Sequence, residues 1–279
     1  YLSFTNFGHR GIGRCRGHTI VSQQFNSLGV YCNYHSGQKL FCNGKDSFLC
    51  RRVRICESDP EFKENRNCNP DELTSDCSRF YDQIIEDITQ NKFRAIPGFT
   101  SLADFSNHPS FQKKIKAKVG AHGSKYTVGK ARKTKKTGNS YLDTFLELEK
   151  RVNSNFFPYV SINAAGIGNH AVSVYKKVVN NGNKRLCVRD SNMPREKFDP
   201  KKILLDKCQN YIKMNGGDAI YTFNGKNHKL SKLDFFSDED NRTKNYVNEY
   251  AAVCKRVQQN ENMCISDGVS NNNTYEWDS

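Results

Sequence analysis

Asn163–Pro194 is the segment that most constrains the fold, because it has the pattern of a β-hairpin. Apolar residues alternate with polar ones after His170, which is typical of a half-buried strand. The chain then reverses at Asn180–Asn183, whose residue types tolerate a positive φ, and returns to Asp190. In an antiparallel hairpin the start of the first strand lies beside the end of the second. We therefore expect the Asp190 carboxylate to reach the His170 imidazole.

The size and composition of the chain are those of a globular protein. Its 279 residues can bury a sizeable core, as one large domain or two packed halves. Hydrophobic residues make up 36%, so the chain is polar but not disordered. No apolar run approaches the ~18 residues of a membrane span. The sequence has neither a phosphate-binding glycine loop nor a cluster of metal ligands, so we expect no cofactor and no metal.

Eleven cysteines predict a disulfide framework. They lack the two-residue spacing of zinc sites, so disulfides are favoured over metal binding. Such a framework, in a chain that begins at Tyr1 without Met, indicates a mature protein that is secreted to an extracellular or periplasmic space. Because eleven is odd, at least one thiol is free if the others pair. Cys15 stands apart from the densest cysteine cluster and is the best candidate; the alternative is a buried or intermolecularly bonded cysteine.

Cys15–Gly29 has the apolar spacing of a helix, with Gly29 as its expected C-terminal cap. Cys15 then lies at the positive end of the helix dipole, and Arg14 and Arg16 flank it. Both effects favour the thiolate, so we expect the pKa of Cys15 to fall below that of a free cysteine.

A cysteine at a helix start, followed much later by a histidine and by a carboxylate on the next strand, is the order found in papain-like cysteine peptidases. Gly13–Phe25 and Gly168–Asn192 resemble that family. The resemblance implies an α+β papain-like fold, stapled by disulfides. Residues 1–154 would form a helical, cysteine-rich half with the nucleophile helix and a basic insertion. Residues 155–279 would form an antiparallel β-rich half with the His/Asp hairpin, completing one catalytic domain.

The same resemblance assigns roles to individual residues. Cys15 would be the nucleophile, His170 the general base and then acid, and Asp190 the group that orients the histidine. His9 stands where the family usually has a glutamine, six residues before the cysteine. We therefore expect either His9 or Asn6 to complete an oxyanion hole with the amide groups of the helix start.

Three alternatives to these roles stay open. A histidine at the end of a strand is often an ordinary surface residue, and His170 could be one. His18 lies three residues after Cys15 and is a rival base, although a side chain one turn along the helix points away from the cleft opening. Asn192, two residues after Asp190, is a rival orienting group.

A basic run lies between the two candidate catalytic segments. The chain carries a formal net charge of +14, and residues 105–142 contain no Asp or Glu. The candidate anion-binding residues of this run are Lys130, Arg132, Lys133, Lys135 and Lys136. The run is either a solvated loop or a surface that attracts an anionic polymer, an anionic envelope or an acidic substrate.

The leading hypothesis is a secreted, monomeric cysteine peptidase or amidase that hydrolyses a peptide, protein or peptidoglycan-like substrate through a thioacyl-enzyme. The same chemistry also serves acyl transferases and crosslinkers. The alternative from another class is a non-enzymatic, disulfide-rich basic protein that binds an anionic polymer or envelope. Rapid alkylation of Cys15 alone would favour the enzyme.

Overall fold

The computed structural model describes residues 2, 14–32, 56, 59–124, 134–135, 140–153, 158–180, 182–192, 208–236, 244–246, 248–249 and 252. The chain divides into two compact units. One comprises Tyr1–Ser3, Gln24–Ala117 and Lys244–Ser279, and the other comprises Phe4–Gln23 and Lys118–Thr243. Each unit is described by itself.

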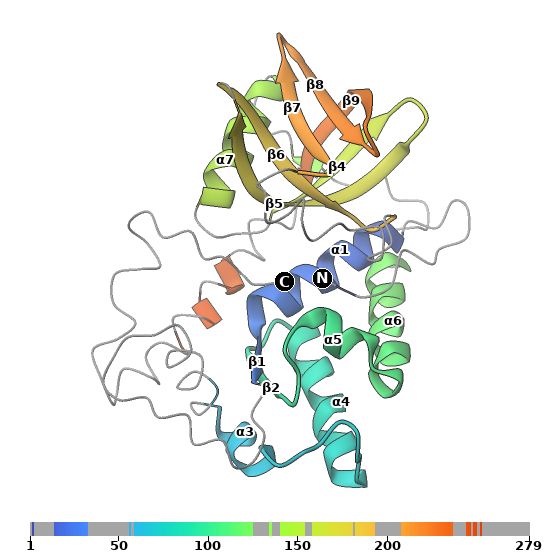
Figure 1. Cartoon of the computed structure of the whole chain (residues 1–279), viewed down its shortest axis with the longest axis vertical. Helices are drawn as coiled ribbons and strands as arrows, with labels where there is room; N and C mark the ends of the chain where they lie inside the picture. Colours follow the sequence, from blue (N-terminus) through green and yellow to red (C-terminus); the bar gives the residue numbers. More distant parts are fainter. Residues whose placement is uncertain are drawn as a thin grey trace. The chain divides into compact units, whose positions relative to one another are not determined.

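The second unit is built on a closed antiparallel β-barrel, labelled β4 to β9 in Figure 1. Its strands are β4 (Tyr159–Ala164), β5 (Gly168–Asn180), β6 (Asn183–Asp190), β7 (Tyr211–Asn215), β8 (Asp218–Phe223) and β9 (Lys226–Phe236). Consecutive strands pair with one another, and β9 pairs with both β8 and β4, which closes the ring. The short β3 (Thr134–Lys135) extends the sheet beside β9. Because the ring is closed, each described barrel strand has a paired neighbour on both sides, so none of them is an edge strand.

The inside of the barrel is filled by alternate residues of its strands, as the two-residue period of a strand requires. Val172 and Val174 of β5 are fully buried, as are Leu186 and Val188 of β6. Helix α7 (Tyr141–Asn153) adds Phe145 and Leu148 to the same core, and it contacts β5, β8 and β9 (Figure 1). The hairpin predicted from the sequence is confirmed, because β5 and β6 pair antiparallel on either side of a turn at Gly182.

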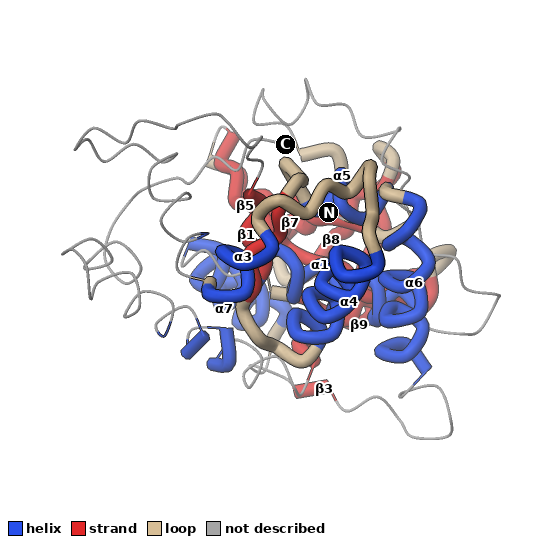
Figure 2. Tube along the Cα trace, turned by 90° about the horizontal axis from the view of Figure 1, so that it is seen from below, coloured by secondary structure: helices blue, strands red, loops and turns tan. Residues whose placement is uncertain are grey.

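The first unit is mainly helical, as its blue tubes in Figure 2 show. Its elements are β1 (Gly29–Cys32), α3 (Pro60–Asn65), α4 (Ser75–Thr89), β2 (Arg94–Pro97), α5 (Leu102–Asn107) and the first part of α6 (Pro109–Ser124). Strands β1 and β2 pair in parallel. An aromatic cluster forms much of the core, with Tyr81, Phe105 and Phe111 in mutual ring contact.

A buried arginine joins three elements of this unit. Arg94 of β2 is 4% exposed, and its guanidinium lies 2.5 Å from the Asp87 carboxylate of α4 and 3.4 Å from that of Asp59, the N-cap of α3. Glu61 adds a third carboxylate at 2.7 Å. Asp87 also pairs with Lys92 at 3.0 Å. Arg94 thus shares the compensation of Asp87 and supplies the ion pair of Asp59, and a buried charge without a partner is strongly destabilising.

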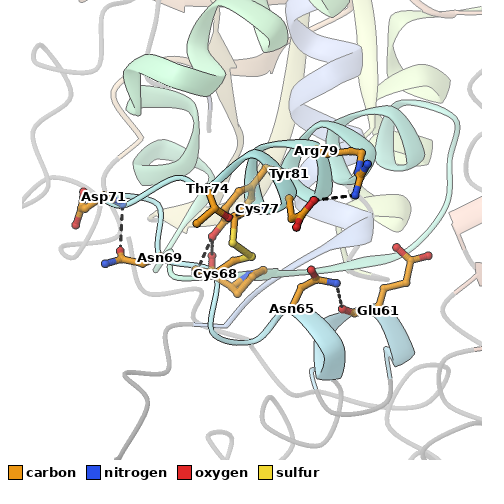
Figure 3. The surroundings of a disulfide bond; sticks show 11 residues. Glu61, Asn65, Cys68, Asn69, Asp71, Thr74, Cys77, Arg79 and Tyr81 are labelled. Carbon is orange, nitrogen blue, oxygen red and sulfur yellow. Dashed lines mark hydrogen bonds and ion pairs between the residues drawn. A yellow bond between two sulfur atoms is a disulfide. The ribbon is translucent and has the colours of Figure 1, made fainter.

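Three disulfides link six of the described cysteines: Cys32–Cys56, Cys68–Cys77 and Cys187–Cys208. Figure 3 shows that the Cys68–Cys77 bridge ties the segment before α4 to its first turn, where Thr74 caps the helix. The Tyr81 hydroxyl lies beside the bridge and is within 3.2 Å of the Cys68 carbonyl oxygen and 3.1 Å of that of Pro97. These bridges confirm the predicted disulfide framework and indicate an oxidising, extracellular-type environment.

The predicted papain-like fold, with a helical N-terminal half and a β-rich C-terminal half, is wrong. The described residues form a closed barrel with a few helices, and the compact units do not follow the two halves. The first part of α1 (Arg14–Leu28) and helix α7 belong to the barrel unit, although both lie in the first 154 residues. Both helices belong to the barrel unit because they bury apolar residues against its strands. Gly29 begins β1 instead of capping the helix, and a Cβ there would lie 2.7 Å from the Phe25 carbonyl oxygen.

Within the described part of the chain, every helix is too short or too polar to cross a lipid bilayer.

Candidate active site

His170 and Asp190 lie together at one end of the barrel. Asp190 pairs directly with Val172 in the β5–β6 ladder, and His170 precedes Val172 by two residues, so both side chains continue the inward-facing rows of their strands. The imidazole Nε2 donates a hydrogen bond to Asp190 Oδ1 at 2.6 Å. Both residues are buried, with 3% and 6% exposed. The proximity expected from the hairpin is therefore observed.

The Asp190 carboxylate accepts hydrogen bonds on both oxygens. Oδ1 also accepts from the backbone N–H of Asn192 at 2.8 Å, and Oδ2 accepts from the Tyr221 hydroxyl of β8 at 2.6 Å. Burial alone raises the pKa of Asp190, but the charge of His170 and these hydrogen bonds hold the pKa below its ordinary value. Asp190 is consequently a fully ionised, fully bonded acceptor at neutral pH.

Cys15 reaches this unit from the first turn of α1, as its second residue. The side chain is 5% exposed and packs with Ile20, Tyr159, Ala171 and Phe236, so the turn is seated on strands β4, β5 and β9. Of the described cysteines it is the one outside the disulfides. A free thiol at a helix N-terminus lies at the positive end of the helix dipole.

Two neighbours of Cys15 hold the helix start against the barrel. The Thr19 hydroxyl lies 2.8 Å from the Cys15 carbonyl oxygen and 3.4 Å from that of Ala171, the residue next to His170. The Arg16 guanidinium lies over the Phe236 ring, 4.5 Å from its centroid. These contacts fix the distance between the thiol and the imidazole through short, buried links.

His170 connects the thiol to the carboxylate. Its side chain hydrogen-bonds to Cys15 as well as to Asp190. Burial alone lowers the pKa of His170, but the Asp190 carboxylate and the Cys15 side chain raise the pKa to about 10. The imidazole is therefore held as imidazolium at neutral pH, between two groups that favour its positive charge.

The rivals for these roles are also found in the structure. His18 is buried one turn after Cys15, and the His170 imidazole hydrogen-bonds to the Cys15 side chain. The Asn192 side-chain amide lies 3.5 Å from His170 Nε2, farther away than Asp190. Asp190 is accordingly the residue with the geometry of an orienting group, while its catalytic role stays a prediction.

The remaining predicted site residues lie mostly outside the described part of the chain. These are His9, Asn6, Lys130, Arg132, Lys133 and Lys136. Lys135 has a described backbone in β3, paired with Phe235. The oxyanion and anion-binding assignments of these residues stay predictions.

Sequence analysis missed two residues of the site. Tyr221 is a fully buried residue of β8 in an apolar strand, so its sequence context is that of a core tyrosine. Thr19 lies within the helix of Cys15, where nothing in the sequence separates it from an ordinary helical threonine. A buried tyrosine whose hydroxyl needs a partner is a weak signal, and it could have prompted a search for an acceptor.

Among the described residues, no group of three or more His, Cys, Asp or Glu side chains could hold a metal ion. The site instead offers a thiol, an imidazolium and a carboxylate in one hydrogen-bonded chain. Such a chain can supply a thiolate nucleophile, a proton donor and acceptor, and a group that fixes the tautomer of the imidazole.

Comparison of the chain with protein families, curated proteins and solved structures found no match.

Proposed function

We propose that this protein is a secreted thiol hydrolase that cleaves a peptide or amide bond through a thioacyl intermediate on Cys15. The observation that supports it is the buried chain from Cys15 through His170 to Asp190, with Asp190 2.6 Å from the imidazole. A structural histidine–aspartate pair needs no free thiol at a helix start, and a structural cysteine needs no imidazolium. The three groups together match the needs of nucleophilic catalysis.

In the first half of the reaction, Cys15 acts as a thiolate beside the His170 imidazolium. The sulfur attacks the carbonyl carbon, and the π electrons of the carbonyl move to its oxygen. Backbone N–H groups at the start of α1 are candidate donors to that oxyanion. The tetrahedral intermediate collapses, the C–N bond breaks, and His170 gives its proton to the leaving nitrogen.

In the second half, neutral His170 takes a proton from water while the water oxygen attacks the thioester. Collapse of the second tetrahedral intermediate releases the carboxylic acid and returns the thiolate–imidazolium pair. An amine in place of water would give acyl transfer with the same residues. Throughout, Asp190 stays ionised and keeps the imidazole in position, because three donors stabilise its charge.

The test is alkylation of the intact protein by iodoacetamide without reductant, followed by peptide mapping. We expect Cys15 to react at a rate that is nearly flat across mildly acidic and neutral pH. In His170→Gln the rate should instead rise about tenfold per pH unit up to the ordinary thiol range near ~8.5. His122→Gln, a change at a half-buried histidine of α6, is the matched control and should leave the profile flat.

Two results would contradict the proposal. One is a wild-type profile that climbs only toward ~8.5, because the thiol would then be an ordinary one. The other is a flat profile in His170→Gln, because the imidazolium would then not be what stabilises the thiolate. Hydrolysis of a peptide library, with Cys15→Ser as the inactive control, identifies the scissile bond.

A further inference from the structure

The barrel end that carries Asp190 also carries a pocket of about 360 Å³. Three segments of the barrel unit line it: the β4–β5 turn, the end of β6 with the turn that follows, and the β8–β9 turn. The lining residues that bear on its chemistry are Ile167, Asn192, Phe223, Asn224, Lys226 and His228. The volume lies at the lower end of small-molecule sites, which suits one or two residues of a peptide and not a polymer.

The pocket is next to the reacting groups. Asp190 lines it, and so does Asn192, whose side-chain amide is 3.5 Å from His170 Nε2. The thiol and the pocket thus share one imidazole as a neighbour. A group bound here would lie beside the His170–Asp190 pair.

The pocket lining contains one lysine and one carboxylate. The carboxylate, that of Asp190, is paired with His170 and bonded on both oxygens. Lys226 contributes an ammonium group to the pocket. Among the described residues, no carboxylate lies at ion-pair distance from it. By contrast, Lys229 on the same strand pairs with Asp218 at 2.7 Å. The uncompensated charge raises the local concentration of anions.

The polar groups of the pocket are suited to a carboxylate. His228 Nδ1 lies 3.4 Å from the Ala165 carbonyl oxygen, so its N–H donates there. Its Nε2 can donate to a carboxylate in the protonated form of the imidazole. Asn192 and Asn224 supply side-chain amide donors, while Ile167 and Phe223 supply apolar walls. The turn that carries Asn224 is fixed, because the Asn224 backbone N–H donates to the Asn210 side chain at 3.1 Å.

We propose that this pocket is a substrate subsite for a carboxylate on a short apolar stem, such as a glutamate side chain or the C-terminal carboxylate of a peptide. This proposal rests on the proposed function, because the ligand is a substrate only if the protein is a hydrolase. The subsite would select acidic peptides by their encounter and binding, while the bond-breaking step stays with Cys15 and His170.

Binding is measured on the full-length Cys15→Ala protein, so that turnover plays no part. The probes are N-acetyl-glutamic acid α-amide, which has only a side-chain carboxylate, N-acetyl-glutamine, which has only a C-terminal one, and neutral N-acetyl-glutaminamide. We expect saturable shifts of the Asn192 and Asn224 side-chain amide resonances with one or both acids and none with the neutral amide. The acid that binds more tightly identifies the source of the carboxylate.

The double variant Lys226→Gln/His228→Gln should weaken binding of the acid about five- to tenfold, the loss expected for partly exposed ionic contacts. Lys229→Gln is the matched control, since it removes the same charge from the same hairpin at a position outside the pocket lining. It should leave the affinity unchanged. Equal binding of all three probes, binding of none, or an undiminished affinity in the double variant would overturn the subsite.

Kinetics separate this proposal from the one on which it rests. On matched peptides that differ by Glu or Gln, the double variant should raise KM for the Glu peptide about five- to tenfold and leave kcat unchanged. Cleavage of both peptides alike by the wild type would overturn the subsite and leave the thiol hydrolase standing. Saturable binding of the acid to a protein that cleaves no peptide would overturn the hydrolase and retain an anion site.

Discussion

Removal of one hydroxyl, in Tyr221→Phe, tests how the carboxylate of the site is held. The Tyr221 ring is fully buried in the barrel core, so phenylalanine fills the same space, and the change deletes the 2.6 Å hydrogen bond to Asp190 Oδ2. Burial and the nearby Asp190 charge raise the pKa of Tyr221 well above its ordinary value, so the phenol is a neutral donor at any working pH.

The expected cost follows from the charge of the acceptor. A hydrogen bond to an ionised group contributes about 1.5–3 kcal/mol, and Asp190 keeps its other two donors, so Tyr221→Phe should lower the free energy of unfolding by about 2 kcal/mol at pH 7. With one donor fewer, the carboxylate holds the His170 proton more tightly. Transfer of that proton to the leaving group then slows, and we expect kcat to fall about tenfold, which corresponds to ~1.4 kcal/mol in the transition state.

The pH dependence separates this effect from general core damage. The pKa of Asp190 is lowered in the folded state, so its stabilising contribution is present above the ordinary value near ~3.8 and is lost as pH falls through the folded pKa. The difference in unfolding free energy between wild type and Tyr221→Phe should therefore be constant above about pH 5 and shrink as the pH falls through the folded pKa of Asp190.

The assay is urea unfolding at pH 7, 5 and 3.5, together with steady-state hydrolysis. Tyr81→Phe is the matched control, because that buried hydroxyl donates to the neutral carbonyl oxygens of Cys68 and Pro97 and not to a carboxylate. It should lower stability by about 1 kcal/mol without an acid-dependent part and without a change in kcat. A Tyr221→Phe protein with full kcat, or with a stability loss that does not shrink in acid, would refute the reasoning.

Three further changes test other parts of the fold. Arg94→Met should destabilise the protein by about 3 kcal/mol in urea unfolding, because it removes the ion-pair partner of Asp59 and leaves Asp87 with Lys92; a loss under 1 kcal/mol would show that these carboxylates are protonated or hydrated. Replacement of the Cys187–Cys208 bridge, which closes a separation of 21 residues, by two alanines should cost about 3 kcal/mol under oxidising conditions and nothing when wild type and variant are compared in reductant. His170→Gln, made in a Cys15→Ser background so that no thiolate titrates, should be most destabilising below about pH 6.5 and progressively less so at higher pH, because Asp190 still raises the pKa of His170 and this stabilisation is lost as the pH rises from the unfolded pKa through the folded one; a loss that grows with pH would contradict the assigned charge.

The sequence predicts local structure here better than architecture. Alternation of apolar residues and a turn of suitable residue types were enough to place His170 beside Asp190. Strand β9 was not predicted, since its buried Leu230 and Leu233 are three residues apart and not two. A bulge explains the spacing: Asn163 pairs with Lys232 and Ala164 with Leu230, which leaves Ser231 as an extra residue.

Closure of the barrel could not be predicted from the sequence, because it depends on a contact between distant segments. The pairing of β9 with β4 joins residues about seventy positions apart, and no local pattern encodes a contact at that separation. The predicted split into a helical and a β-rich half failed because α1 and α7 each have an apolar face that the barrel buries. The site was predictable as far as its charged and nucleophilic groups, whereas Tyr221 could be recognised only once β8 was placed beside Asp190.

Because Cys15 is buried against strands β4, β5 and β9, its thiol is exposed during synthesis until these strands have been made. The thiol leaves the ribosome 221 residues before Phe236, the last residue that covers it, which is roughly 10–45 s at ordinary elongation rates. The cysteines of the first unit emerge and begin to pair in that interval, on a similar timescale. Cys15 is thus an exposed competitor in disulfide exchange until the barrel closes over it, and a nascent or unfolded chain carries only an ordinary thiol. Assembly of the barrel therefore both buries the sulfur and brings it to the imidazole.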